Sequence, residues 1–268
     1  MLDFKPKKKL GQSFLVNQNI ARAEAVHGAG KIVIEMGPGL GVLTKELCKV
    51  AKKVIAVELD SDLYSRLGRE LKSKKLKLIN KDFFEATGEE LELGNADIMI
   101  ANIPYQLSSK TIEFLSSNSL PAVLCLQKEF VEHMLAKPGE RSYSKLSVVA
   151  QLSFRLRKIM DVSRGNFNPV PKVDSSIVLI EPKRKIDKAA LHILSALMEH
   201  KKKTVKNAIE DAAKELGISK EQAKAIAQEV SNSSARVFKL SPESLLSLAE
   251  EIGRIIEESN KAPESVAE

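Results

Sequence analysis

Three glycines, in the segment Gly37-Pro-Gly-Leu-Gly41, directly follow a β-branched run at 31–36. The run predicts a strand, and glycines at its end let the backbone turn sharply and approach a ligand without an intervening side chain. A dinucleotide fingerprint would need a further glycine where this chain has Val42. The spacing therefore favours a nucleoside ligand without a pyrophosphate. Glu35, just before the loop, either contacts that ligand or braces the turn.

Two acids follow the next strands of the chain. Glu58 ends the run 53–58, and Asp82 follows the run 76–79, with Phe83 beside it. An acid at the end of the second strand in such folds accepts hydrogen bonds from ribose hydroxyls. Asp82 could accept a hydrogen bond from an adenine amine while Phe83 packs on the ring. Both acids could instead cap helices or turns, but three consecutive strand ends with suitable groups favour a binding site.

A fourth strand, predicted over 96–101, leads into Asn102-Ile103-Pro104-Tyr105. The exocyclic amine of adenine is a weak nucleophile, and acceptors aimed at its two hydrogens would orient it and stabilise the charge that grows on nitrogen. The Asn102 side-chain oxygen and the Ile103 carbonyl could be these acceptors. Pro104 stiffens the turn, and Tyr105 could stack on the base.

These residues are predicted to lie on an α/β framework. Strands alternate with helices of about 10 residues or more, which predicts a parallel sheet with helices on both faces. The predicted strands are 31–36, 53–58, 76–79, 96–101, 122–126 and 176–181, and the predicted helices are 17–27, 42–50, 61–73 and 108–117. From 187 to about 258 the sequence is helical, and Ser241-Pro242 marks a helix start. We therefore predict an α/β domain at 1–182 with a basic N-terminal arm, a small helical domain at 183–268, and a disordered tail.

The charge distribution favours a polyanionic partner. The net charge is +7; residues 137–174 carry eight Lys and Arg against three acids, and residues 183–206 carry eight against two. Cys48 and Cys125 are too few for a disulfide framework, and neither they nor the histidines show metal-ligand spacing. The protein is therefore expected to hold no metal. No segment is predicted to be a secretion signal or a membrane span, which favours a cytoplasmic protein.

Together these motifs resemble the ribosomal RNA adenine dimethyltransferases of the KsgA type, archaeal members in particular, over at least residues 8–182. The matching segments are Lys9-Leu-Gly-Gln-Ser-Phe-Leu15, Glu35-Met-Gly-Pro-Gly-Leu-Gly41, Val57-Glu-Leu-Asp60, Lys81-Asp-Phe83, Asn102-Ile-Pro-Tyr105, Gln127-Lys-Glu129, Pro138-Gly139, Tyr143-Ser-Lys-Leu-Ser147 and Phe167-Asn-Pro-Val-Pro-Lys-Val-Asp-Ser175. Two residues depart from those usual in that family. Ser13 puts in doubt how the N-terminal segment covers the cofactor, and His133 puts in doubt one phosphate or structural contact.

The resemblance implies a Rossmann-like class I methyltransferase sheet and S-adenosyl-L-methionine as the cofactor. It implies that Gln12 and Phe14 close over the cofactor, that Glu58 holds its ribose, and that Asp82 and Phe83 hold its adenine. It also implies that Asn102 and Tyr105 bind the target base and that Phe167 stacks on its other face. The predicted cofactor site comprises Gln12, Phe14, Glu35, Gly37, Gly39, Gly41, Glu58, Asp82, Phe83 and Asn102.

The implied substrate is a pair of adjacent adenosines in a hairpin near the 3′ end of small-subunit ribosomal RNA, each methylated twice. The expected partner is the small ribosomal subunit, approached by a monomer. The predicted RNA contacts are Lys7, Lys8, Lys9, Arg141, Lys172, Lys201, Lys202 and Lys203. The lysine run 201–203 could equally be the solvent-exposed face of a helix.

Three alternatives stay open at this point. A related class dimethylates one adenine of large-subunit RNA and confers antibiotic resistance; it shares most of these motifs. An assembly factor could keep the fold and bind RNA with dispensable catalysis, although intact Glu58, Asp82 and Asn102 argue against a degenerate site. A nicotinamide-dependent oxidoreductase is disfavoured by Val42.

Overall fold

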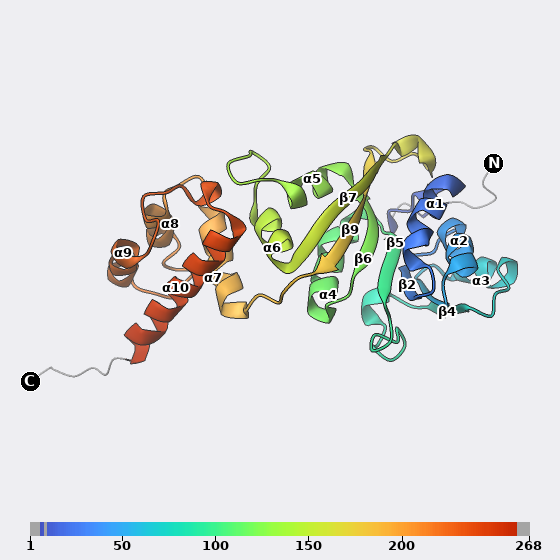
Figure 1. Ribbon diagram of the computed structural model, residues 1–268, viewed down its shortest axis with the longest axis horizontal. Coiled ribbons are helices and arrows are strands. Elements are labelled where there is room, and N and C mark those ends of the chain that lie inside the picture. The colour runs from blue at the N-terminus through green and yellow to red at the C-terminus, as the bar shows by residue number, and fades with distance from the viewer. Residues whose placement is uncertain (1–5, 8–9, 262–268) are drawn as a thin grey trace, which may run out of the picture. The chain divides into compact units, whose positions relative to one another are not determined.

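A computed structural model describes residues 6–7 and 10–261, without the side chains of the last two (Figure 1). Lys8 and Lys9, predicted to contact RNA, and most of the predicted disordered tail lie outside the described residues. The chain forms two compact units. The first comprises Met1–Val131 and Phe154–Pro182, and the second comprises Glu132–Ser153 and Lys183–Glu268.

This division differs from the predicted single boundary after residue 182, because Glu132–Ser153 belongs to the helical unit. Tyr143, Val148 and Leu152 of this segment are buried in the same apolar cluster as the C-terminal helices. A short amphipathic helix shows in its sequence that it has an apolar face, but it does not show which core that face joins.

The first unit is built on a seven-stranded sheet with the strand order β4-β3-β2-β5-β6-β9-β7 (Figure 1). The strands are β2 (Ile32–Met36), β3 (Lys53–Glu58), β4 (Leu76–Asn80), β5 (Ile98–Asn102), β6 (Ala122–Gln127), β7 (Phe154–Val162) and β9 (Ser175–Pro182). Strands β2 to β6 pair in parallel, as predicted, whereas β9 pairs antiparallel with both β6 and β7. Parallel neighbours need a crossover connection, usually a helix, and none lies between β7 and β9. These two strands therefore pair antiparallel.

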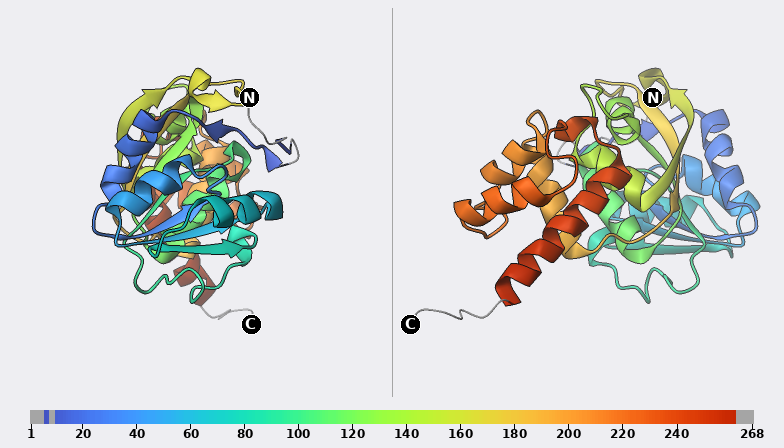
Figure 2. Two further views of the ribbon diagram at one scale, coloured as in Figure 1. Left: turned by 90° about the vertical axis from the view of Figure 1, so that its right-hand side faces the viewer. Right: turned by 60° about the vertical axis from the view of Figure 1, so that its left-hand side comes forward.

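Helices cover both faces of this sheet, as predicted (Figure 2). They are α1 (Gln18–Ala25), α2 (Val42–Val50), α3 (Ser61–Glu70), α4 (Ser108–Asn118) and α5 (Lys128–Leu135), the last of which runs into the second unit. Val33 and Val54 are buried in one cluster with α1 and α2, while the alternate residues Ile34 and Ile55 are equally inaccessible to solvent. Because successive strand residues point to opposite faces, both faces of the sheet are covered.

A second, two-stranded sheet joins distant segments of the first unit. Strand β1 (Phe14–Leu15) pairs antiparallel with β8 (Phe167–Asn168). The sequence did not predict this pairing, because two-residue strands leave no periodic pattern. It fixes the N-terminal segment beside Phe167.

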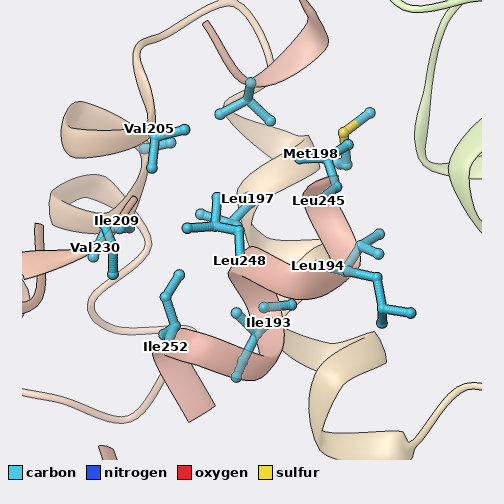
Figure 3. Packing of buried hydrophobic residues seen from close by; sticks show 14 of the residues in the cluster. Ile193, Leu194, Leu197, Met198, Val205, Ile209, Val230, Leu245, Leu248 and Ile252 are labelled. Carbon is cyan, nitrogen blue, oxygen red and sulfur yellow. The ribbon is translucent and has the colours of Figure 1, made fainter. Parts of the chain in front are cut away.

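The second unit is helical, as predicted for its C-terminal part. Its helices are α6 (Lys145–Ser153), α7 (Lys188–Glu199), α8 (Val205–Asp211), α9 (Lys220–Glu229) and α10 (Pro242–Lys261). Figure 3 shows apolar side chains of α7 and α10, such as Leu197 and Leu248, within its core. The predicted start of α10 is confirmed, since the Ser244 N–H donates to Ser241 Oγ at 3.0 Å. Among the described residues, no helix is both long and apolar enough to cross a membrane.

Candidate active site

A cavity of about 230 Å³ lies in the first unit. Residues at or just after the carboxyl ends of β2, β3, β4 and β5 line it. Strands β3 and β4 follow β2 on one side, and β5 and β6 continue on the other, so the strand order reverses between β2 and β5. Ligands of open α/β sheets bind at this reversal.

The glycine loop forms one wall of the cavity. Gly37, Gly39 and Gly41 have φ angles of 67°, 56° and 74°, a region that side-chain-bearing residues rarely adopt. A Cβ atom on Gly39 would lie 2.8 Å from the ring of Phe14, and one on Gly41 would lie 2.4 Å from Leu67. The backbone conformation therefore favours glycine at all three positions, and close neighbours add to this at Gly39 and Gly41.

Glu58 holds the glycine loop from the end of β3. Its Oε2 accepts a hydrogen bond from the Gly39 N–H and its Oε1 accepts one from the Asp60 N–H, both at 2.9 Å. Burial raises the pKa of this carboxyl group, while these backbone hydrogen bonds lower it. Each carboxylate oxygen can accept a second hydrogen bond. Glu58 can thus shape the loop and still accept hydrogen bonds from hydroxyl groups in the cavity.

Asp82 and Phe83 line the cavity beyond β4. Asp82 also caps the short 3₁₀ turn Phe83–Glu85, because its Oδ1 accepts a hydrogen bond from the Phe84 N–H at 2.9 Å. Phe83 packs edge-on against Phe114, with ring centroids 5.0 Å apart. The capping and binding interpretations of Asp82 are therefore compatible, since one carboxylate oxygen caps and the other is left for a ligand.

The N-terminal segment closes another side of the cavity. Gln12 Nε2 donates to Asp60 Oδ2 at 2.9 Å, and the Ser13 hydroxyl donates to the Pro169 carbonyl at 2.7 Å. Lys7, a predicted RNA contact, forms ion pairs with Asp60 and Asp62 at 2.7 and 2.8 Å. Burial opposes ionisation of Asp60, but hydrogen bonds from Lys7 and Gln12 prevail and lower its pKa.

The predicted base-binding residues meet at the same cavity. Asn102, Ile103, Pro104, Tyr105 and Phe167 all line it. The Tyr105 hydroxyl lies 2.8 Å from Ser175 Oγ, which fixes the half-buried ring. Phe167 is brought there by the pairing of β8 with β1 and is 5% exposed.

Four buried polar atoms of this unit lack hydrogen-bond partners within the described protein: Glu24 Oε1, Glu35 Oε2, Thr44 Oγ1 and Asn102 Oδ1. Of these four residues, Glu35 and Asn102 line the cavity. Asn102 Nδ2 donates one of its two N–H groups to Glu24 Oε2 at 3.0 Å, and the amide oxygen is the acceptor that remains for a ligand. Burial raises the pKa of Glu24 and of Glu35 to about 8. Unsatisfied buried acceptors are rare in folded proteins and are typical of a site completed by a ligand.

Sequence reasoning missed Glu24 and Asp60. Glu24 lies in α1 among the buried residues Ile20, Ala21 and Ala25, at the spacing of an apolar helix face. An acidic residue on the apolar face of a predicted helix is the signal that could have identified Glu24. Asp60 belongs to a recognised motif, but its contacts with Lys7 and Gln12 depend on the tertiary fold.

The remaining predicted RNA contacts differ in their surroundings. Arg141, Lys172 and Lys202 are exposed. Lys201 Nζ donates to the Tyr143 carbonyl, and Lys203 pairs with Asp211, so both lysines have partners in the second unit. Within the described residues, no group of three or more acidic, His or Cys side chains could hold a metal ion.

The fold and the cavity define a class I methyltransferase that uses S-adenosylmethionine. The strand order, the glycine loop, the acids after β3 and β4, and the unpartnered acceptors near β2 and β5 fit a nucleoside carrying an amino acid group.

Comparison with known proteins specifies the family. Residues 3–254 match the sequence profile of ribosomal RNA adenine dimethylase, and this chain belongs to that family. It is 38% identical over 254 residues to a probable ribosomal RNA small subunit methyltransferase A of Thermococcus gammatolerans, covering 92% of this chain and 89% of the relative.

Several solved structures are similar to this chain, among them the two that follow. A dimethyladenosine transferase from Plasmodium falciparum has a TM-score of 0.76 and 28% identity, covering 90% of this chain and 98% of the other. The 23S rRNA methyltransferase ErmE has a TM-score of 0.59 and 23% identity, covering 89% and 99%. The second likeness concerns the fold alone.

Proposed function

We propose that this enzyme dimethylates the exocyclic amines of two adjacent adenosines in a hairpin near the 3′ end of small-subunit ribosomal RNA. It acts as a cytoplasmic monomer on the small ribosomal subunit and contributes to ribosome assembly. The observation that carries the chemistry is the buried, unpartnered Oδ1 of Asn102 at the cavity. The relatives named as small-subunit methyltransferases support the substrate.

In this proposal the cofactor occupies the side of the cavity formed by β2, β3 and β4. Glu58 accepts hydrogen bonds from its ribose, Asp82 and Phe83 hold its adenine, and Glu35 lies near its amino acid end. Gln12 and Phe14 cover it. When bound, S-adenosylmethionine supplies an electrophilic methyl group, so the acceptor needs orientation more than deprotonation.

Asn102 Oδ1 and the Ile103 carbonyl accept hydrogen bonds from the two hydrogens of the target amine. These acceptors stabilise the positive charge that grows on the amine nitrogen during attack. Tyr105 and Phe167 hold the base by stacking, which contributes about 1–3 kcal/mol per base. After the first transfer the cationic amine releases one proton to solvent and keeps one hydrogen, so a single acceptor suffices for the second. Two methyl groups are the limit, because the amine has two hydrogens.

The large-subunit alternative has weaker support. ErmE shares the fold at 23% identity, whereas several relatives named for the small subunit are 35–39% identical to this chain. An assembly factor with dispensable catalysis would not need acceptors kept buried and unpartnered at the cavity, since these lower stability.

The test incubates the protein with labelled S-adenosylmethionine and small ribosomal subunits that lack the dimethyl marks. Large subunits run in parallel, and mass spectrometry maps the modified nucleosides. We expect dimethyladenosine at two adjacent small-subunit positions. Label on the large subunit would move the enzyme to the resistance class, and cofactor binding without transfer to either subunit would favour the assembly role.

A further inference from the structure

We propose that Glu24 is a positioning residue that turns the Asn102 carboxamide so that its oxygen, and not its nitrogen, meets the target amine. This inference rests on the proposed function, in which Asn102 accepts a hydrogen bond from that amine. Glu24 does not itself line the cavity. It acts from α1, behind Asn102, through one hydrogen bond of 3.0 Å.

The need for such a residue follows from the chemistry of an amide. The two ends of the Asn side chain have nearly the same shape, but the oxygen accepts hydrogen bonds and the nitrogen donates them. If Nδ2 pointed toward the cavity, the N–H groups of Asn102 would face those of the target amine, and two donors cannot form a hydrogen bond with each other. A productive site therefore requires an element that distinguishes the two orientations.

Glu24 provides this distinction when it is ionised, because a carboxylate can only accept hydrogen bonds. The Asn102 Nδ2 group then faces Glu24, and Oδ1 is left buried and unpartnered at the cavity. A protonated carboxyl group can also donate, and would tolerate the reversed orientation. An apolar side chain would favour neither.

A purely structural role explains Glu24 poorly. The residue is fully buried, and its Oε1 has no hydrogen-bond partner among the described residues. Burying a carboxyl group with an unsatisfied oxygen lowers the stability of the fold. Replacing Glu24 by an apolar residue removes this cost, but it also leaves Asn102 Nδ2 without its hydrogen-bond partner, and the two effects on stability oppose each other. Stability should therefore change little while turnover falls.

The surroundings of Glu24 predict a pH dependence. Burial raises its pKa to about 8, opposed by the hydrogen bond from Asn102. The titratable groups that face it are Glu35 on β2 and Cys125 on β6, and Glu24 raises the pKa of each. Ionisation of Glu24 favours the productive orientation, so turnover should rise as the pH rises through about 8.

The experiment compares Glu24→Leu, Glu24→Gln, Asn102→Ala and the double variant Glu24→Leu/Asn102→Ala. Single-turnover methylation is measured with saturating cofactor across pH 6–9, together with the cofactor Kd and the Tm. Glu46→Leu is the matched control, because Glu46 is another buried acid of the same unit and does not line the cavity.

We expect Glu24→Leu to slow methylation by about 10- to 100-fold, the loss typical of a hydrogen bond to a charged group. Its Tm should change little and its cofactor Kd should stay unchanged. Glu24→Gln should lose only about twofold, because an amide allows both orientations of Asn102, and should lack the rise near pH 8. The double variant should be no slower than Asn102→Ala.

A wild-type rate in Glu24→Leu would overturn the proposal. Additive losses in the double variant, or a loss of rate matched by losses of Tm and cofactor affinity, would overturn it too. The test can use any RNA that the wild-type enzyme methylates. Failure of the wild type on small subunits would instead contradict the proposed function, so the two failures are distinguishable.

Discussion

The two units bury different kinds of residue. Every buried acid among the described residues lies in the sheet unit: Glu24, Glu35, Glu46, Glu58 and Asp60. The helical unit buries an apolar cluster, and its buried polar side chains within the described part are Ser147 and Ser153. Apart from Glu46, these acids line the cavity or contact residues that line it. The difference indicates that the sheet unit gives up stability to keep polar groups at its cavity, whereas the helical unit is organised around packing.

The largest expected effect is on the rate of methyl transfer and comes from a polar residue of the sheet unit. Asn102→Ala should lower the rate of methyl transfer by about 10²–10³-fold, because it removes an acceptor that acts as charge develops. Cofactor Kd and RNA Kd should change little. Single-turnover kinetics and calorimetry measure these quantities, and Asn118→Ala, at an exposed position of α4, is the control. A large loss of RNA affinity with an intact rate would contradict the amine-orienting role.

The opposite response is expected in the helical core. Leu197→Ala should lower the free energy of unfolding of that unit by about 2–5 kcal/mol, the usual result of a cavity in a packed core. Leu197 is fully buried in α7, whereas Glu199 in the same helix is exposed and provides the control Glu199→Ala. Urea unfolding measures stability, and calorimetry should show an unchanged cofactor Kd. A changed cofactor Kd would contradict the assignment of packing to the helical unit and of ligand binding to the sheet unit.

A smaller effect is expected for the ribose acceptor. Glu58→Ala should weaken cofactor binding by about 10- to 100-fold, since hydrogen bonds to a charged group are lost. RNA affinity, measured without cofactor, should be nearly unchanged. Glu46→Ala removes a buried acid of the same unit that pairs with Lys49 outside the cavity, and should not affect cofactor binding. Equal losses of cofactor and RNA affinity would argue against the ribose assignment.

The smallest effect concerns the surface of the helical unit. Lys202 is exposed, and no ion pair involves it within the described residues, whereas Lys203 pairs with Asp211. Lys202→Ala should reduce the slope of log K against log salt for RNA binding by about 0.9 if it contacts one phosphate. Lys203→Ala should leave the slope unchanged. Identical slopes for wild type and Lys202→Ala would identify the lysine as a solvated surface residue.

Much of the site could be predicted because it depends on strand ends. In a parallel sheet the carboxyl ends of neighbouring strands meet at one edge, so Gly37, Glu58, Asp82 and Asn102 had to converge once their strands were identified. Local patterns also predicted the start of α10. They predicted the strand β9 but not its antiparallel direction, and they did not show which core the segment 132–153 joins, because periodicity does not reveal the partner of an element.

The sequence by itself thus determined the class of fold, the cofactor class and the residues that end the central strands. Only the tertiary structure decided that Lys7 pairs with Asp60 and that Glu24 holds Asn102, 78 positions away in the chain. Strand ends follow from local hydrophobic patterns, which any window of sequence displays. Contacts between an N-terminal segment or a covering helix and the sheet depend on how whole elements pack, and no local pattern encodes that arrangement.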